Sequence, residues 1–434
     1  MEDHPGTADR APAAVVPSLS DRDDHRSAPP AASVLSDVDG IGARIDPVAD
    51  SSGDREPGAL GGPGHLLSLI ASGRATSRSE LVRFTGLAPS TVSARVEALI
   101  DSGWVAEGGL ESSRGGRRAR SLSVNSTLGY LLIADIGATH IRVLATDLAG
   151  ATLAEIEQPV DLAEGPERIA DRIAAIGGEL SADSAVTGRR LRGAAVAIPG
   201  PVDARTRRVI SPSRMPGWHD SPFGDVLGRR LGVPVVIEND ANLMALGMLA
   251  GGAAPARDLV VVKIGGGIGC GVITDGRLYR GASGVAGDIS HNRVADAADR
   301  PCSCGNTGCL ETIASGAALV RDLAAAGAPV AAVADILSLV QHNDSAATTA
   351  MRTAGRQIGE VLATMVNFVN PEAVHLAGHL AVAEPLVAAV RSAIYERCLP
   401  VATRSLTISA VQDRDLGIRA AAALVLQSIR AVAE

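Results

Sequence analysis

The segment Cys302–Glu311 constrains this chain more than any other stretch of its sequence. It reads Cys-Ser-Cys-Gly-Asn-Thr-Gly-Cys-Leu-Glu and holds three of the chain's five cysteines, and His291 lies upstream of it. Three thiolates and one imidazole form a closed ligand set for a tetrahedral structural zinc ion. The glycines in this segment permit the tight turns that would gather the ligands. The spacing therefore predicts a zinc site formed by His291, Cys302, Cys304 and Cys309.

Two other interpretations of these cysteines are a disulfide bond and a set of buried, inert thiols. The first ten residues, MEDHPGTADR, carry acids and a proline where a secretory signal would be basic and then apolar. A reducing compartment favours metal ligation over disulfides for clustered cysteines. No apolar run approaches the roughly 20 residues that a membrane span needs. We therefore expect a cytoplasmic protein without a membrane segment.

Charge is distributed unevenly along the chain, whose formal net charge is −8. Residues 1–60 carry five arginines against twelve acidic residues, lack sustained periodicity, and are predicted to form a disordered acidic tail. Residues 61–125 carry eight arginines against five acidic residues. A basic module between an acidic tail and a mildly acidic body is typical of nucleic-acid-binding proteins.

Apolar spacing within residues 61–125 predicts three short helices and then a basic hairpin that contains glycines, which is the plan of a winged helix-turn-helix. Its third helix, expected from Ser90 to Ser102, would enter the major groove, and its wing would follow the DNA backbone. The alternative is a winged helix that contacts only proteins and whose arginines are solvated. The residues that we expect to contact DNA are Ser90, Thr91, Ser93, Arg95, Arg117 and Arg118.

From Tyr130 onward, predicted strands alternate with predicted helices in two halves that share a plan. In each half a glycine-bearing turn is followed by further strands and helices. This pattern predicts a two-lobed α/β body that closes on a cleft. We expect the body to cover residues 128–432, with lobes at about 128–245 and 246–415 and a last helix at 416–432.

Three further motifs carry chemistry, and each has a structural alternative. Asp135-Ile-Gly-Ala-Thr139 follows a strand, where backbone N–H groups can approach a phosphate and an aspartate can hold Mg²⁺ through water. Residues 265–271 contain five glycines between two strands, which indicates a phosphate cradle or a close-packed turn. Asp240 lies between a predicted strand and a predicted helix. Its carboxylate can act as a general base toward a hydroxyl, or it can cap the N-terminus of that helix.

Taken together and in this order, the segments Glu238–Asn242 (ENDAN), Ala286–His291 (AGDISH) and Cys302–Glu311 resemble the ROK family of repressors, open reading frames and kinases. The resemblance covers roughly residues 62–430. It implies an actin-like ATPase-type fold, that of the sugar kinase and hsp70 superfamily, with a sugar in the cleft between the lobes.

The resemblance also implies roles for individual residues. Asp240 would be the base toward the phosphorylated hydroxyl, a role that is vestigial if the kinase activity is lost. Zinc held by one nitrogen of His291 would leave the other nitrogen for a sugar hydroxyl. The implied sugar-binding residues are Asn239, Asp240, Asp288, His291 and Glu311, and the implied phosphate-binding residues are Asp135, Gly137, Thr139, Gly265, Gly266, Gly267 and Gly269.

This sequence departs from the kinases of the family mainly on the nucleotide side. Their Gly-Gly-Thr-Lys is Gly-Ala-Thr-His140 here, and the threonine of their second phosphate loop is replaced by Gly266, which has no hydroxyl. A glycine pair near the adenosine becomes Gly-His379. In the sugar motif, Asp288 replaces a glutamate and Ser290 a glycine. These changes disfavour ATP more than they disfavour sugar.

We therefore expect a DNA-binding transcriptional regulator of carbohydrate metabolism, a repressor, whose kinase-like body senses a sugar or sugar derivative. The expected partners are operator DNA, a sugar effector and further copies of the chain, as a dimer or tetramer. The expected cofactor is a structural zinc ion. The alternative is an ATP-dependent sugar kinase of the glucokinase or N-acetylhexosamine kinase type, which would also need ATP and Mg²⁺. A purely structural zinc protein would explain neither the wing nor the cleft carboxylates.

Overall fold

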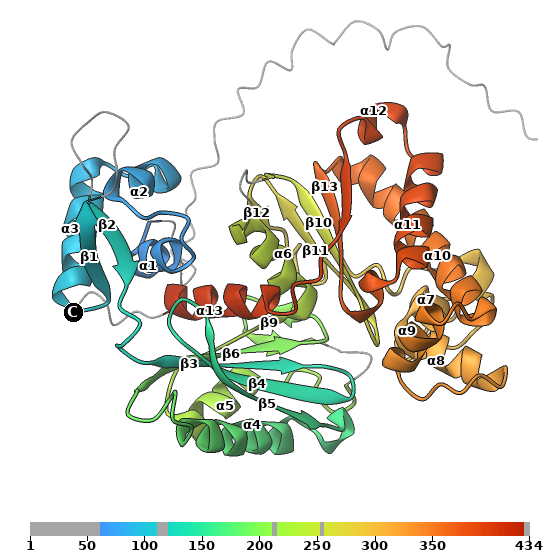
Figure 1. Ribbon diagram of the computed structural model, residues 1–434, viewed down its shortest axis with the longest axis horizontal. Helices are drawn as coiled ribbons and strands as arrows, with labels where there is room; N and C mark the ends of the chain where they lie inside the picture. Colours follow the sequence, from blue (N-terminus) through green and yellow to red (C-terminus); the bar gives the residue numbers. More distant parts are fainter. Residues whose placement is uncertain (1–60, 111–119, 211–214, 252–255, 429–434) are drawn as a thin grey trace, which may run out of the picture. The chain divides into compact units, whose positions relative to one another are not determined.

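The computed structural model describes residues 61–110, 120–210, 215–251 and 256–428 (Figure 1). The first described elements are three helices and a two-stranded antiparallel hairpin, as expected for a winged helix-turn-helix. Arg117 and Arg118 of the predicted wing, and the predicted acidic tail, lie outside the described residues. The elements are α1 (Pro63–Ala71), α2 (Arg78–Thr85), α3 (Pro89–Asp101), β1 (Val105–Leu110) and β2 (Arg120–Val124).

Local sequence signals fix the ends of these helices. The Ser77 hydroxyl accepts a hydrogen bond from the backbone N–H of Glu80 and so caps α2. The Glu80 carboxylate reaches back to the backbone N–H of Thr76 at 2.7 Å, one residue before the N-cap. Pro89 occupies the first position of α3, where its missing N–H has no intrahelical partner to lose. The apolar face of α3 is fully buried at Val92, Val96 and Leu99.

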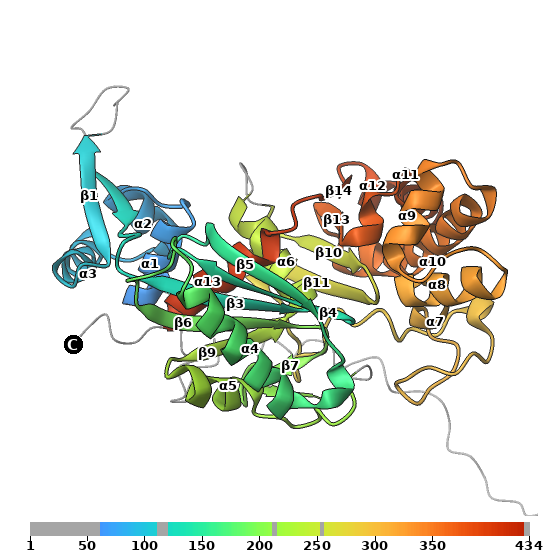
Figure 2. The same cartoon turned by 60° about the horizontal axis from the view of Figure 1, so that its bottom comes forward.

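The first lobe of the body contains a five-stranded sheet of order β5-β4-β3-β6-β9. Strand β3 pairs antiparallel with β4 and parallel with β6. Helices α4 and α5 pack on one face of the sheet, and α13 packs on the other (Figure 2). The elements are β3 (Tyr130–Ile136), β4 (His140–Thr146), β5 (Thr152–Pro159), α4 (Pro166–Ser181), β6 (Leu191–Ile198), β7 (Val202–Asp203), β8 (Arg208–Val209), α5 (Phe223–Leu231), β9 (Val235–Asn239) and α13 (Leu416–Ser428), with the short 3₁₀ helix η1 (Leu162–Glu164).

The second lobe repeats this plan with a five-stranded sheet of order β12-β11-β10-β13-β14, in which β10 pairs antiparallel with β11 and parallel with β13. Helix α6 packs on one face of the sheet, and the α10–α11 pair packs on the other. The elements are α6 (Asp240–Gly251), β10 (Leu259–Ile264), β11 (Ile268–Thr274), β12 (Arg277–Leu278), η2 (Ala295–Ala297), α7 (Glu311–Ala314), α8 (Gly316–Ala325), α9 (Val333–Gln341), α10 (Ser345–Val369), β13 (Ala373–Ala377), η3 (His379–Val382), α11 (Glu384–Arg397), α12 (Pro400–Thr403) and β14 (Thr407–Ala410).

Alternation along the strands explains how each sheet buries both faces. In β3, Leu131 and Ile133 pack toward α13, whereas Leu132 and Ala134 pack toward α4 and α5. Successive side chains of a strand point to opposite faces, so a run of apolar residues is needed when both faces are covered. The expected two-lobed body is confirmed. Among the described residues, no helix is both long and apolar enough to cross a membrane.

Candidate functional site

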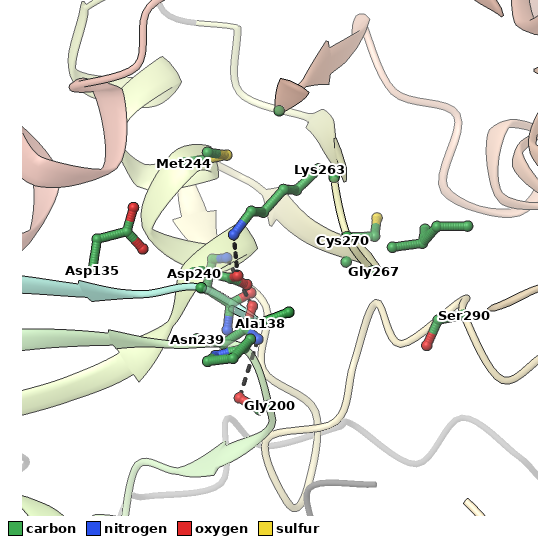
Figure 3. Close-up of a pocket in the computed structure, with 18 of the residues that line it drawn as sticks. Asp135, Ala138, Gly200, Asn239, Asp240, Met244, Lys263, Gly267, Cys270 and Ser290 are labelled. Atoms are coloured by element: carbon green, nitrogen blue, oxygen red, sulfur yellow. Dashed lines mark hydrogen bonds and ion pairs between the residues drawn. The ribbon is translucent and has the colours of Figure 1, made fainter. Parts of the chain in front are cut away.

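A cavity of about 620 Å³ opens where residues of both lobes converge (Figure 3). It gathers residues that lie as far apart in the sequence as Asp135 and Arg414. Of the residues expected at the sugar and phosphate sites, those that line the cavity are Asp135, Gly137, Asn239, Asp240, Gly265, Gly266, Gly267, Gly269, Asp288, His291 and Glu311. Thr139 is exposed and is not among the lining residues.

Asp240 is the first residue of α6 and is buried, with 7% of its surface exposed. Its Oδ1 atom accepts a hydrogen bond from the backbone N–H of Ala241 at 2.7 Å. Its Oδ2 atom forms an ion pair with the ammonium of Lys263 on β10 (Figure 3). The expected base therefore has a cationic partner, which we did not expect from the sequence. The available signal was that Lys263 is the only lysine of the chain.

Asn239, rather than Asp240, caps helix α6. Its Oδ1 atom accepts hydrogen bonds from the backbone N–H groups of Ala241 and Asn242 at 3.0 and 3.1 Å. Its side-chain nitrogen donates to the Gly200 carbonyl at 3.1 Å, a bond drawn in Figure 3. The helix-cap alternative considered for Asp240 thus applies to its neighbour, and the Asp240 carboxylate faces the cavity.

Glu238, which precedes Asn239 and Asp240, forms a second ion pair with Arg280. Glu238 Oε2 accepts from Nε and Nη2 of Arg280 at 3.0 and 2.7 Å, and its Oε1 accepts from the side-chain nitrogen of Asn242 at 2.9 Å. Because Arg280 precedes the loop that carries Asp288, the pair connects that loop to the start of α6. Bidentate arginine–carboxylate pairs fix orientation as well as distance.

Truncation of Glu238 should be costly, because it is 5% exposed and leaves the Arg280 guanidinium without its carboxylate. We expect Glu238→Ala to lower the free energy of unfolding by about 3 kcal/mol, as for other broken buried pairs. Urea unfolding measures this, with Glu396→Ala as the control, since Glu396 is exposed and accepts a hydrogen bond from Ser392 in the same helix. Equal stability of the two variants would contradict the structural role of the pair.

The glycine-rich segment divides into two functions. Gly265 has open space around it, and Gly266 lies next to Ala138 of the first lobe. A Cβ atom on Gly271, by contrast, would lie 2.6 Å from the Ala241 carbonyl oxygen. The later glycines therefore let β11 approach α6 closely, which is the packing alternative. The earlier ones border the cavity.

Glu311 and Asp288 hold the loops that border the cavity. The Glu311 carboxylate accepts a hydrogen bond from the backbone N–H of Ile268 at 3.0 Å, so it ties α7 to the glycine-rich turn. The Ser290 hydroxyl donates to Asp288 at 2.6 Å. Serine at this position, one of the departures noted above, thus fixes the orientation of the neighbouring carboxylate. The backbone N–H groups of Leu310 and Glu311 donate to the carbonyls of Asn292 and Ser290.

On the nucleotide side, the two unexpected histidines meet. His140 at the start of β4 and His379 in η3 place their ring centroids 6.2 Å apart in an edge-on arrangement, and both line the cavity. Burial lowers the pKa of His379, and the neighbouring His140 and Lys263 lower it further. Two imidazoles from opposite lobes therefore lie together where the resemblance places the nucleotide.

The cysteine cluster has the dimensions of a metal site. The side chains of His291, Cys302, Cys304 and Cys309 offer ligand atoms that all lie within 4.8 Å of one another. The sulfurs of Cys304 and Cys309 are 3.7 Å apart, and Cys302 Sγ is 3.4 Å from His291 Nδ1. Metal–sulfur bonds of 2.3 Å at tetrahedral angles separate two sulfurs by about 3.8 Å. The four side chains therefore fit one tetrahedral ion.

The thiols influence one another. Burial raises the pKa of Cys304, but hydrogen bonds from the Asn306 backbone and from the two other thiols outweigh it, so its pKa is lowered. Burial and the other two cysteines raise the pKa of Cys309 to about 12. None of the chain's cysteines forms a disulfide.

Helix α3, which we expected to enter the major groove, exposes part of the expected set of DNA-binding residues. Ser90 is exposed, and Thr91 and Ser93 are partly exposed. The Arg95 guanidinium donates to the Gly61 carbonyl oxygen, so it is engaged within the domain. Arg78, which was not expected to matter, forms ion pairs with Glu97 of α3 and with Glu107 of β1 and thereby joins α2, α3 and the hairpin.

A winged helix-turn-helix joined to a two-lobed actin-like body with an acidic cavity defines the class: sugar-kinase-fold proteins that carry a DNA-binding domain. The chain belongs to the ROK family, whose model matches residues 132–428, and a winged helix-turn-helix DNA-binding model matches residues 65–106. Its architecture is that of the family's transcriptional regulators.

Similar proteins and solved structures support this assignment. The xylose repressor of Bacillus spizizenii is 32% identical over 337 residues, which cover 77% of this chain and 86% of the repressor. The structure of a ROK family transcriptional regulator homologous to the E. coli MLC protein has a TM-score of 0.67 at 25% identity and covers 84% of this chain and 95% of that one. A Streptomyces griseus ROK glucokinase with glucose and AMPPNP has a TM-score of 0.61 at 27% identity, with 68% of this chain and 99% of that one covered.

Proposed function

We propose that this protein is a cytoplasmic transcriptional repressor whose binding to operator DNA responds to a neutral monosaccharide in the cavity. The observation that carries the proposal is the combination, in one chain, of a winged helix-turn-helix and a cavity lined by Asp240, Asp288 and Glu311. Carboxylates accept hydrogen bonds from neighbouring hydroxyls of a sugar. The proposed division of the chain is a tail at 1–60, a DNA-binding domain at 61–125 and a sugar-sensing body at 128–432.

A buried acceptor in the cavity supports a hydroxyl-bearing ligand. Asn242 is 4% exposed and lines the cavity, and its Oδ1 atom has no hydrogen-bond partner among the described residues. Its side-chain nitrogen is held by Glu238, so the oxygen is fixed in position. A buried acceptor without a donor costs about 1–3 kcal/mol. A ligand hydroxyl would remove that cost.

Charge balance favours a neutral sugar over a sugar phosphate. The lysine and both arginines that line the described cavity are paired: Lys263 with Asp240, Arg142 with Glu155 and Asp415, and Arg414 with Glu157. A phosphate would have to displace carboxylates from these cations. Because xylose repressors are similar to this chain, D-xylose is the first sugar to test.

We propose that the cysteine cluster holds zinc as a structural ion. Zn²⁺ prefers thiolate and imidazole ligands, and three cysteines with one histidine leave no open position for a reacting molecule. His291 Nδ1 faces the Cys302 sulfur, and the residue also lines the cavity. A metal on Nδ1 leaves only Nε2 to reach a ligand, so the ion would orient a side chain of the sugar site.

The second candidate function is sugar phosphorylation, which the retained Asp240 favours. Two observations count against it: Lys263 already occupies an oxygen of the expected base, and His140 and His379 lie together on the nucleotide side. The experiment that separates the candidates is a thermal-shift panel of D-xylose, D-glucose and N-acetylglucosamine, each with and without Mg·ATP. Ligands of the folded state raise its melting temperature. Stabilisation by a sugar alone is the expected result, and stabilisation that needs ATP would favour the kinase.

The DNA interface can be tested at the wing. Arg117→Ala with Arg118→Ala should lower affinity for all duplexes by roughly tenfold and reduce the slope of log K against log salt by about two, because each phosphate contact contributes about one to that slope. Anisotropy titrations across salt concentrations measure both, on duplexes selected by the full-length protein from a random pool. The control is a variant with Arg168→Ala and Arg404→Ala, because both arginines are exposed on the body. An unchanged salt slope in the wing variant would remove the wing from the interface.

The recognition helix should behave differently. Ser90→Ala or Thr91→Val should change which duplexes are preferred, by about 1–3 kcal/mol at the affected base pair, while the salt slope stays the same. The proposed binding unit is a dimer held together by the body, since two half-sites are read by two winged helices.

A further inference from the structure

Helix α6 connects two features that the proposed function treats separately. Its first turn carries Asp240 and the unpartnered oxygen of Asn242, both in the cavity. Further along, it contacts α13, the last helix of the described chain. Because α6 packs on the sheet of the second lobe and α13 on the sheet of the first, this is a contact between the lobes.

The contact between α6 and α13 is unusually close. A Cβ atom on Gly247 of α6 would lie 2.4 Å from the carbonyl oxygen of Leu416, the first residue of α13. One turn earlier, Leu243 of α6 belongs to the same buried cluster as Ile418 and Ala421 of α13. The Leu416 carbonyl and the Leu416 side chain both lie against Gly247, so there is no room for a side chain on α6 at this point of the contact.

The opposite end of α13 holds the winged helix-turn-helix. A Cβ atom on Gly64 of α1 would lie 2.7 Å from the Gln427 carbonyl oxygen, and the Gln427 side chain donates to the Ser68 hydroxyl at 3.1 Å. Leu66, Leu67 and other residues of the winged helix share one continuous hydrophobic core with α13 and the first sheet. The DNA-binding domain and the first lobe are therefore packed as one body.

The start of α13 also reaches the cavity directly. Residues 411–414, which immediately precede it, line the cavity. Asp415 forms an ion pair with Arg142 of β4 at 2.7 Å, and Arg142 is itself a cavity residue. From Leu416 to Gln427 the helix extends about 16 Å, at 1.5 Å per residue. It thus spans the distance from the ligand cavity to α1 (Figure 1).

We propose that the α6–α13 pair couples the cavity to the DNA-binding domain, so that a ligand on Asp240 and Asn242 changes DNA affinity by moving α6 against α13. The inference rests on the proposed function, because it needs a ligand in the cavity and DNA on the winged helix. A ligand that draws the lobes together moves the second lobe relative to the first lobe and its attached winged helix. Differential binding to the two lobe arrangements then appears as a change in DNA affinity.

The test uses two glycines of the same helix. Gly247→Ala places a methyl group against Leu416, whereas Gly251→Ala meets no atom of the described residues within 4 Å and serves as the matched control. For each full-length variant, DNA affinity is measured with and without D-xylose, or with whichever sugar of the panel raises the melting temperature. Sugar affinity is measured with and without DNA.

In the wild type and Gly251→Ala, we expect sugar to change DNA affinity at least tenfold, which corresponds to about 1.4 kcal/mol of coupling. In Gly247→Ala the ratio should fall to within about twofold of one, although sugar and DNA each still bind. Reciprocity requires the effect of DNA on sugar affinity to fall by the same factor.

A second pair of variants tests the other end of α13 and covers the case in which Gly247→Ala does not fold. Gln427→Ala removes the bond to Ser68, and Ser428→Ala, whose hydroxyl donates to the Val425 carbonyl of the same helix, is its control. The coupling ratio should fall in the former alone. Sugar-dependent DNA binding that is equal in all four variants would overturn the coupling and leave the proposed effector intact. If no sugar of the panel binds the wild type, the proposed effector is wrong and the coupling falls with it.

Discussion

Exchanging Cys304 for serine should remove the metal from the protein. Elemental analysis of the wild type, purified without chelator, is expected to find about one zinc ion per chain. The same analysis of Cys304→Ser is expected to find less than about a tenth of that amount. A serine hydroxyl is a far poorer zinc ligand than a thiolate, and metal affinity at such sites is also folding free energy. The melting temperature should fall by roughly 5–10 °C.

Loss of the metal should also weaken binding at the sugar site. The backbone of Leu310 and Glu311, directly after the last cysteine, is hydrogen-bonded to Asn292 and Ser290 of the loop that carries Asp288. Glu311 in turn holds the glycine-rich turn through Ile268. Loosening the cluster should therefore weaken sugar binding at least tenfold, even though no cysteine of the cluster needs to touch the sugar.

Cys398→Ala is the control for this experiment. Cys398 is buried, and its thiol donates to the Ala363 carbonyl of α10, outside the cluster. Its loss should cost some stability and leave zinc content and sugar affinity unchanged. Metal-free wild-type protein with full sugar affinity would show that the cluster neither holds zinc nor supports the cavity.

Local pattern was sufficient to predict much of the fold. Strand β10 (Leu259–Ile264) and helix α8 (Gly316–Ala325) follow apolar runs in the sequence, and the structure adds that Ser315 caps α8. Helix α11 was not among the expected elements, although Leu386, Val387, Val390 and Ile394 have helical spacing. Strands β7, β8 and β12 have two residues each, which is too short for any periodicity, so only their pairing defines them.

At the site, too, features set by neighbouring residues were predictable and pairings between distant residues were not. Motifs predicted most of the residues that gather at the cavity, because Asp135, Asp240 and Gly265 each stand at the end of a strand. They did not predict pairings across sequence distance, such as Lys263 with Asp240 or Arg280 with Glu238. Such pairs depend on how strands and loops of two lobes are brought together, which a single sequence does not specify.

These pairings decide what the expected base can do. In a kinase, Asp240 would accept a proton from the sugar hydroxyl that attacks the phosphate. Here its Oδ2 atom is bound to the Lys263 ammonium and its Oδ1 atom to the Ala241 N–H, so each oxygen has one lone pair left, and a proton transfer from the sugar would have to take place beside the Lys263 cation. The same carboxylate can still accept a hydrogen bond from a bound hydroxyl, because each oxygen has two lone pairs.

Asp240→Asn should therefore abolish sensing and leave no enzymatic phenotype. The amide keeps the shape but cannot pair with Lys263, which stays in the cavity as an uncompensated cation, so sugar affinity should fall at least tenfold. Isothermal titration with the sugar found in the thermal-shift panel measures this. Asp258→Asn is the control. The Asp258 carboxylate accepts a hydrogen bond from the backbone N–H of Asp275, and Asp258 does not line the described cavity.

Coupled ATP turnover across the same sugars completes the test. Enzymes typically turn over about 10 times per second, and we expect the wild type to be at least a thousandfold slower with every sugar of the panel. Lys263→Met separates the two reasons for inactivity. If turnover rises in this variant, the ammonium was the block; if it does not, the contact between His140 and His379 on the nucleotide side is sufficient to exclude ATP. Wild-type turnover near 10 per second that disappears in Asp240→Asn would instead make the protein a sugar kinase that also binds DNA.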